Sequence, residues 1–219
     1  MDQRVITARI LLFDMDGTLV DSSAVVERTW RLFAERHGLD GATVLADAHG
    51  RPTAETVARH LPGATDAAAE TARIVASEVS DVDGIVPVPG AVELLSQLPA
   101  ANWAVVTSAG RELAERRMAA AGLNLPGVVV SADDVRSGKP DPEGYLLAAE
   151  RLGATAAEAV VFEDAAAGLL AARSSGASPV VVGGHDGPAA VGLPRVEDLR
   201  SVTTDRRTHD GLLVQIRNR

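Results

Sequence analysis

The sequence predicts an α/β fold in which a doubly wound parallel β-sheet carries a small all-helical cap inserted after its first strand. Two observations predict this class. Short apolar runs alternate with helical patterns from about residue 91 onward, which is the order expected of strands joined by crossover helices. In contrast, residues 22–83 contain no strand-like run and are helical in pattern throughout.

The predicted strands are short runs rich in Val, Ile and Leu that end in polar or glycine-containing turns. A run that stays apolar, rather than alternating with polar residues, is typical of a strand buried on both faces of a parallel sheet. Such runs lie at residues 10–13, 103–107, 128–130, 159–162 and 179–182.

Helical patterns fill the intervals between the later strands, at residues 91–98, 111–121, 143–152 and 167–175. Gly122, Gly153 and Gly176 directly follow the last three of them. We expect these glycines to end the helices, because glycine readily adopts the left-handed backbone of a helix C-terminus.

The helical interval after the first strand is predicted to contain a helix at 23–36 closed by Gly38, a helix at 53–60 and an alanine-rich helical stretch at 65–82. Prolines at 87 and 89 then favour an extended connector. We therefore predict an α/β catalytic core formed by residues 1–21 and 85–219 and a helical cap formed by residues 22–84. The tail after Thr203 is polar and then apolar at 212–216, and its pattern assigns it no role.

The composition narrows the function classes. Hydrophobic residues make up 46% and charged residues 23% of the chain, as in soluble globular proteins. The net charge of −9 disfavours nonspecific binding to nucleic acid or to an anionic membrane, and no apolar stretch approaches the length of a membrane span or a signal peptide. With no cysteine the chain has no disulfide and no thiol chemistry, which suits a cytoplasmic protein. We expect a monomer, with a dimer as the alternative.

The first strand ends in an acidic pair, Asp14 and Asp16, followed by Gly17. Side chains two residues apart in extended backbone point to the same side, so the two carboxylates can converge. Two such close carboxylates require either a shared proton or a cation between them, and this is the arrangement of a nucleophile beside a general acid. A solvated turn is an equally good interpretation of this pair alone.

A second acidic pair, Glu163 and Asp164, ends the strand at 159–162. In isolation Asp164 fits the N-cap of the following helix. Acidic pairs at two strand ends, however, would gather in one cleft, where only a metal ion makes their charge tolerable. Oxygen ligands alone favour Mg²⁺.

Two further segments suit a phosphate group. Thr107, Ser108 and Ala109 follow a strand at the start of a helix, where hydroxyls and backbone amides can bind phosphate oxygens, although ordinary helix capping fits them as well. Lys139 lies between Gly138 and a Pro-Asp-Pro segment. Most lysines only solvate a surface, but an ammonium beside these carboxylates would neutralise them and a transferred phosphoryl group.

Together these features indicate phosphoryl transfer. They also resemble a known family: FDMDGTLVDS at 13–22, VVTSAG at 105–110, SGKPDPEGY at 137–145 and VFEDAAAGLLAA at 161–172 are similar, in this order, to the four motifs of the haloacid dehalogenase-like superfamily. The resemblance covers nearly all of residues 9–183.

The resemblance implies a mechanism. Asp14 would attack phosphorus, while Asp16 would protonate the leaving oxygen and later take a proton from the hydrolytic water. Asp14, the backbone carbonyl of Asp16, and Asp164 would bind Mg²⁺, with Glu163 holding its waters.

It also implies that Thr107 or Ser108, the backbone at Ala109 and Lys139 would grip the phosphate, and spacing does not decide between the two hydroxyls. The chain departs from many relatives at Ala165, where a serine is common, so any help from that hydroxyl is missing.

Within the predicted cap, RHGL at 36–39 and HGRPT at 49–53 are similar to sugar and polyol phosphatases that act on 2-deoxyglucose 6-phosphate, hexitol phosphates or glycerol phosphate. This similarity implies substrate contacts from His49, Gly50, Arg51 and Thr53, although a helix-capping turn explains Gly50 and Thr53 equally well.

The expected function is therefore a Mg²⁺-dependent phosphatase for a small phosphorylated metabolite, a sugar or polyol phosphate, acting through an aspartyl-phosphate on Asp14. A β-phosphoglucomutase-like mutase is one alternative. It is disfavoured because residues 25–27 are Val-Val-Glu where such mutases carry a histidine. The other alternative is a non-catalytic phosphometabolite-binding protein, although Asp14, Asp16, Lys139 and Asp164 are all present.

Overall fold

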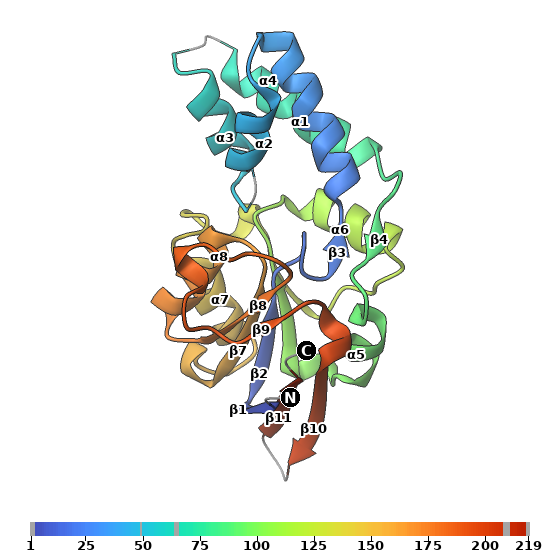
Figure 1. The fold of residues 1–219 in the computed structure, drawn as a ribbon, viewed down its shortest axis with the longest axis vertical. Helices are drawn as coiled ribbons and strands as arrows, with labels where there is room; N and C mark the ends of the chain where they lie inside the picture. Colours follow the sequence, from blue (N-terminus) through green and yellow to red (C-terminus); the bar gives the residue numbers. More distant parts are fainter. Residues whose placement is uncertain (1–2, 49, 64–65, 208–210, 218–219) are drawn as a thin grey trace.

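Six parallel strands form the main sheet in the computed structural model, which describes residues 3–48, 50–63, 66–207 and 211–217. The strand order is β6-β5-β2-β7-β8-β9, so the first strand of this sheet lies in its middle (Figure 1). The strands are β2 (Ile10–Phe13), β5 (Trp103–Val106), β6 (Val128–Val130), β7 (Ala159–Glu163), β8 (Ser178–Val182) and β9 (Arg195–Val196). The predicted α/β fold with a parallel sheet is confirmed, and every predicted strand is present.

Helices cover both faces of this sheet. They are α5 (Ala91–Gln97), α6 (Arg111–Ala120), α7 (Glu143–Arg151) and α8 (Ala166–Ser175). Successive residues of β2 enter different apolar clusters: Leu11 and Phe13 pack with α5 and α6, whereas Ile10 and Leu12 pack with α7 and α8. Because each strand is buried on both faces, its sequence is a continuous apolar run, as predicted.

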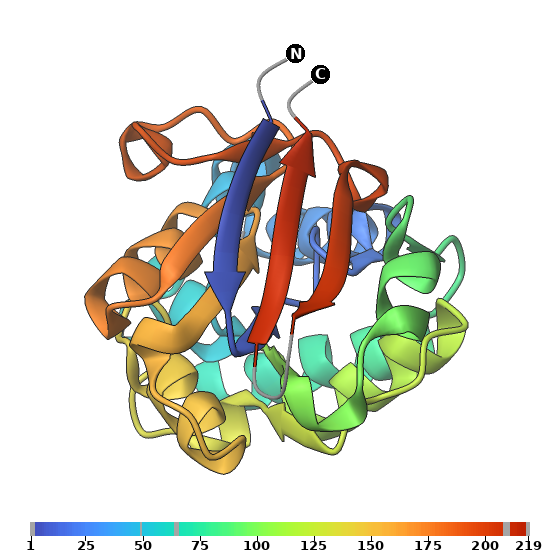
Figure 2. The same cartoon turned by 90° about the horizontal axis from the view of Figure 1, so that it is seen from below.

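A second, antiparallel sheet of three strands, in the order β1-β11-β10, lies beneath the main one (Figure 2). It consists of β1 (Gln3–Ala8), β10 (Val202–Arg207) and β11 (Gly211–Arg217). Leu212, Val214 and Ile216 point into the same apolar cluster as Leu11 and Phe13. The tail to which the sequence assigned no role therefore closes one end of the core.

In the described part of the segment between β2 and the rest of the main sheet there are four helices. They are α1 (Ser23–His37), α2 (Gly41–Ala48), α3 (Thr53–His60) and α4 (Ala67–Ser80), and they share an apolar cluster of their own around Trp30, Phe33 and Ile74. In Figure 1 they lie above the sheet, at the opposite end of the molecule from β10. The division into a core and a cap at residues 22 and 84 remains our proposal.

Two short strands connect this helical segment to the sheet: β3 (Val20–Asp21) pairs antiparallel with β4 (Val86–Pro87), in the segment predicted to be extended. Single turns of 3₁₀-helix complete the structure at η1 (Ala100–Asn102), η2 (Ala132–Asp134), η3 (Ala156–Glu158), η4 (Pro188–Ala190) and η5 (Leu199–Ser201). Among the residues that the structure describes, none of the helices combines the length and apolar character needed to cross a bilayer.

Candidate active site

Three neighbouring strands of the main sheet bring the predicted polar residues together. β2 pairs with β5 on one side and with β7 on the other, all in parallel. Asp14 follows β2, Thr107 follows β5, and Glu163 is the last residue of β7. Because the strands are parallel, their carboxyl ends meet at one edge of the sheet, which is where open α/β sheets bind ligands.

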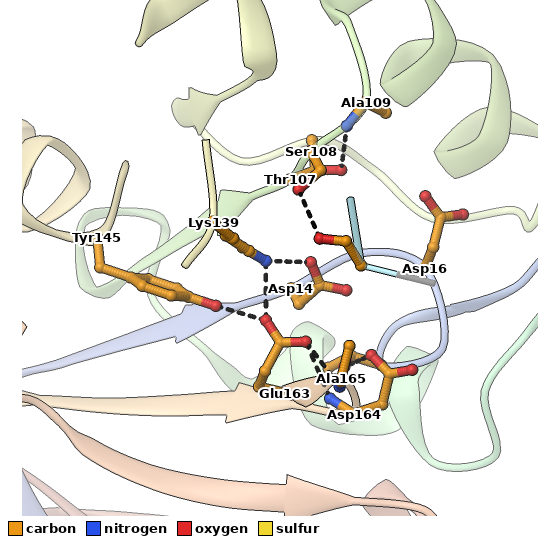
Figure 3. A network of polar contacts seen from close by, with 12 residues as sticks. Asp14, Asp16, Thr107, Ser108, Ala109, Lys139, Tyr145, Glu163, Asp164 and Ala165 are labelled. Carbon is orange, nitrogen blue, oxygen red and sulfur yellow. Dashed lines mark hydrogen bonds and ion pairs between the residues drawn. The ribbon is translucent and has the colours of Figure 1, made fainter. Parts of the chain in front are cut away.

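Lys139 holds two of the acids. Its ammonium donates to Oδ1 of Asp14 and, at 2.8 Å, to Oε2 of Glu163 (Figure 3). All three side chains are buried. A buried charge is tolerated when it is paired, so this lysine is no ordinary surface residue.

Glu163 is fully engaged at the base of the site. Oε2 accepts from Lys139 and, at 2.7 Å, from the hydroxyl of Tyr145. Oε1 accepts from the backbone amides of Asp164 and Ala165 at 3.1 and 3.0 Å. A carboxylate offers about four lone-pair positions, so these donors use all that Glu163 has.

The buried acids of the site would carry more negative charge than Lys139 alone can balance. Burial, with the nearby charge of Glu163, raises the pKa of Asp14 to about 8 even though Lys139 opposes this. Burial and the same glutamate also raise the pKa of Asp164 well above its usual value. Burial opposes the charge of Lys139, but Asp14 and Glu163 outweigh it, and the pKa of the lysine is raised.

A divalent cation fits this set of residues. A carboxylate oxygen from each of Asp14, Glu163 and Asp164 lies within 4.8 Å of the other two. Because four donors already use the lone pairs of Glu163, Asp14 and Asp164 are the side chains of this group that could bind an ion directly. Oxygen donors alone, crowded in a buried site with an excess of negative charge, suit a hard ion such as Mg²⁺.

Gly17 allows the turn after β2 to pack closely against Asp164. Its φ is 86°, and a β-carbon at this residue would lie 2.1 Å from Oδ2 of Asp164. The hydroxyl of Thr18 donates to Oδ1 of the same carboxylate at 3.3 Å. The turn after β2 can therefore reach the end of β7 only with glycine at residue 17.

Asp16 lines the same cavity as Asp14, but its carboxylate has other partners. Oδ1 accepts from the hydroxyl of Ser22 at 2.6 Å, and Oδ2 accepts from Nη1 of Arg117 at 2.8 Å. In Figure 3 this carboxylate points away from Lys139. Asp14 and Asp16 thus share the cavity while their carboxylates belong to separate polar groups.

The segment after β5 lines the opposite wall. Thr107, Ser108 and Ala109 all border the cavity. The hydroxyl of Thr107 accepts from the amide of Ala109 at 3.0 Å, whereas the hydroxyl of Ser108 donates to the carbonyl of Gly50 at 3.3 Å.

Residues of the helical segment close the cavity from above and leave about 120 Å³. Among the predicted substrate contacts, Gly50, Arg51 and Thr53 line it, and His49 lies outside the described residues. Trp30, Glu78 and Arg117 also line it.

Sequence reasoning missed these three residues. Each lies inside a helix, where an aromatic or a charge is usually an ordinary core or surface residue, and only the packing of α1, α4 and α6 brings them to one place. Tyr145 is the last residue of the motif at 137–145, but its contact with Glu163 is visible only in the structure.

Comparisons with known proteins agree on one family. A family model for haloacid dehalogenase-like hydrolases matches residues 8–176. Over 215 residues the chain is 39% identical to hexitol phosphatase A of Escherichia coli (strain K12), covering 93% of this chain and 97% of that protein. Over 237 residues it is 30% identical to 2-deoxyglucose-6-phosphate phosphatase 1 of Saccharomyces cerevisiae (strain ATCC 204508 / S288c), covering 97% and 96%.

Solved structures show the same fold. A hydrolase from Pseudomonas syringae is similar with a TM-score of 0.76 and 29% identity over 87% of this chain and 94% of that one. A β-phosphoglucomutase from Clostridium difficile is similar with a TM-score of 0.77 and 21% identity over 88% and 92%, a likeness of fold alone.

Proposed function

The chain belongs to the haloacid dehalogenase-like hydrolases, and from this we propose that it is a Mg²⁺-dependent phosphatase of small sugar or polyol phosphates that forms an aspartyl-phosphate on Asp14. It is then a phosphoric monoester hydrolase. The observation that carries the proposal is the buried cluster in which Lys139 joins Asp14 to Glu163 beside Asp164. The names of the similar phosphatases support the substrate class.

Asp14 is the nucleophile of this proposal. Its carboxylate oxygen forms a bond to phosphorus as the bond from phosphorus to the ester oxygen breaks. Asp16 gives its proton to the leaving alcohol, and then accepts a proton from the water that hydrolyses the acyl phosphate. Inorganic phosphate leaves, and both carboxylates return to their starting states.

Mg²⁺ is held by Asp14, Asp164 and the backbone carbonyl of Asp16 in this proposal. When bound, the ion supplies the positive charge that the buried acids and the phosphate oxygens require. Glu163, whose lone pairs are already used, fixes Lys139 and the backbone at 164–165 and orients the site from below.

The phosphate is bound from two sides. Lys139 supplies an ammonium, and Thr107, Ser108 and the backbone at Ala109 supply hydrogen bonds close to the N-terminus of α6. Gly50, Arg51 and Thr53 face the leaving alcohol from above, and His49 completes this predicted set. We place the enzyme in the cytoplasm, which the absence of cysteine suits, and we propose that it is a monomer.

A phosphate-release screen tests the proposal. Hexitol, sugar, glycerol and nucleotide monophosphates are incubated with the protein in Mg²⁺ or in EDTA, beside Asp14→Asn. We expect release from hexitol or sugar phosphates in Mg²⁺ only, and none with Asp14→Asn. Preference for nucleotides would reject the substrate class, and full activity of Asp14→Asn would reject the nucleophile. Interconversion of glucose phosphates without net release would identify a mutase, and binding without turnover a non-catalytic protein.

A further inference from the structure

Arg117 connects the candidate acid Asp16 to the helical segment above the site. It lies on α6, and only 3% of its surface is exposed. Nη1 donates to Oδ2 of Asp16 at 2.8 Å, and Nη2 donates to Oε1 of Glu78 at 2.8 Å. Glu78 lies on α4 and is 4% exposed.

The guanidinium of Arg117 fixes how the carboxylates of Asp16 and Glu78 are oriented relative to each other. A guanidinium is always charged and planar, and its donors leave in fixed directions, so two carboxylates bound to different nitrogens are held at a fixed angle to each other. Two buried charges also have a strong reason to stay paired, because a single unpaired one would be costly.

Asp16 is fixed at both oxygens by this arrangement. Ser22 donates to Oδ1 and Arg117 donates to Oδ2, while 28% of the side chain remains exposed. A hydroxyl can rotate about its own bond, whereas the guanidinium is braced by Glu78. Arg117 therefore sets the direction in which this carboxylate faces the cavity.

We propose that Arg117 is a positioning residue for Asp16 and that Glu78 anchors Arg117 from the helical segment. The inference rests on the proposed function, because it concerns proton transfer to the leaving alcohol. It makes the orientation of Asp16 depend on the packing of α4 against α6.

The neighbouring Arg116 offers a matched control. It is exposed, lies on the same helix, and its Nε donates to the carbonyl of Val79, next to Glu78 on α4, at 3.3 Å. Arg116→Met thus removes a cation and a contact with α4 without touching Asp16.

The test uses aryl phosphates of similar shape whose leaving groups differ in acidity. Phenol is a poor leaving group that needs a proton from Asp16, whereas 4-nitrophenol leaves well without one. Misplacing the acid therefore slows the hydrolysis of phenyl phosphate more than that of 4-nitrophenyl phosphate. General damage to the site slows the hydrolysis of both esters equally.

We expect Arg117→Met to lower the ratio of kcat/KM for phenyl over 4-nitrophenyl phosphate by about 10-fold or more, in the direction of Asp16→Asn. Arg117→Lys should recover part of that ratio, and Arg116→Met should keep the wild-type ratio. Adding Asp16→Asn to Arg117→Met should lower the ratio no further than Asp16→Asn alone. Since Arg117→Met leaves Glu78 unpaired, the double variant Arg117→Met/Glu78→Gln serves if the single one is poorly folded by circular dichroism.

An unchanged ratio in a folded Arg117 variant would overturn the inference, as would an effect on KM alone, which would assign Arg117 to substrate binding. These results leave the proposed function intact when the wild type is active. If the wild type releases phosphate from none of the esters, the proposed function fails and the inference falls with it.

Discussion

Gly168, in the first turn of α8, packs directly on the carboxylate of Glu163: a β-carbon at residue 168 would lie 1.7 Å from Oε2. This oxygen is the one that accepts from Lys139 and Tyr145. The absence of a side chain at residue 168 therefore decides where the base of the site can lie.

Gly168→Ala should displace Glu163 and with it Lys139. We expect kcat/KM to fall by about 100-fold, and the free energy of unfolding to fall by about 1–3 kcal/mol from overpacking. Gly127→Ala is the control, since a β-carbon there meets nothing within 4 Å. Phosphate-release kinetics and chemical denaturation measure both effects, and wild-type behaviour of Gly168→Ala would contradict the close packing.

Tyr145→Phe removes one donor from Glu163 and keeps the ring. The lost hydrogen bond leaves a buried acceptor unsatisfied, so the free energy of unfolding should fall by about 1–3 kcal/mol. Because Lys139 and two backbone amides still hold Glu163, kcat should fall less than about 10-fold. A loss of activity as large as that of Asp14→Asn would instead place the phenol hydroxyl in the chemistry.

Mg²⁺ should stabilise the protein, and more strongly as the pH rises. Burial and Glu163 raise the pKa of Asp14 to about 8, so the folded protein keeps a proton that the unfolded chain releases near pH 4. Without Mg²⁺, stability therefore falls as pH rises from about 4 to about 8. Mg²⁺ competes with that proton, so its affinity should rise up to about pH 8 and then level off.

Thermal unfolding with and without Mg²⁺ between about pH 6 and pH 9 measures this effect, independently of activity. Asp164→Asn should lose the stabilisation, and Asp40→Asn, which alters an exposed acid before α2, should keep it. Equal stabilisation of wild type and Asp164→Asn would place the ion elsewhere.

Asp134 should make stability depend on acid pH. Burial opposes its ionisation, but hydrogen bonds from Ser131 and Arg151 outweigh this and hold its pKa well below the usual value. Its contribution is therefore present above about pH 4 and lost as the pH falls further. Asp134→Asn should lower the free energy of unfolding by about 1–2 kcal/mol at pH 7 and by much less near pH 2. A pH-independent difference would contradict the ionised state of this carboxyl.

The antiparallel sheet should contribute to stability mainly through one of its two faces. Val214 is fully buried, whereas Val5, on the opposite face of the same sheet, is 51% exposed. Val214→Asp should lower the free energy of unfolding by about 3 kcal/mol or more, because it buries an unpaired charge, and Val5→Asp by less than about 1 kcal/mol. Urea denaturation of both variants compares the two faces.

The main sheet could be predicted because burial on both faces leaves an unbroken apolar run, as in β2 and β8. The antiparallel sheet could not, because β1 and β11 are covered on one face only, and their other face mixes polar residues such as Gln215 with apolar ones such as Val5. A short segment of this kind is easily predicted as a strand only when its pairing partner is near in sequence. Here the two partners, β1 and β11, lie at opposite ends of the sequence. The sequence also predicted no individual helix at α2, because its eight residues are too few to form a stable helix without tertiary packing.

Part of the candidate site could likewise be predicted from the sequence, and part could not. Strand tips gather side chains wherever the strands are neighbours, so Asp14, Glu163 and Asp164 could be predicted to meet. The proximity of Glu78 to Arg117 depends on how α4 packs on α6, and no spacing in the sequence encodes that distance.

The pairing of β1 with β11 has a consequence for biosynthesis. Among the described strands, β1 hydrogen-bonds to β11 alone, and nearly the whole chain separates the two. A ribosome therefore releases β1 long before its partner exists, so β1 must wait, unpaired, until β11 emerges. The parallel layer can assemble before β11 is synthesised, whereas the layer beneath it can form only after β11 has emerged.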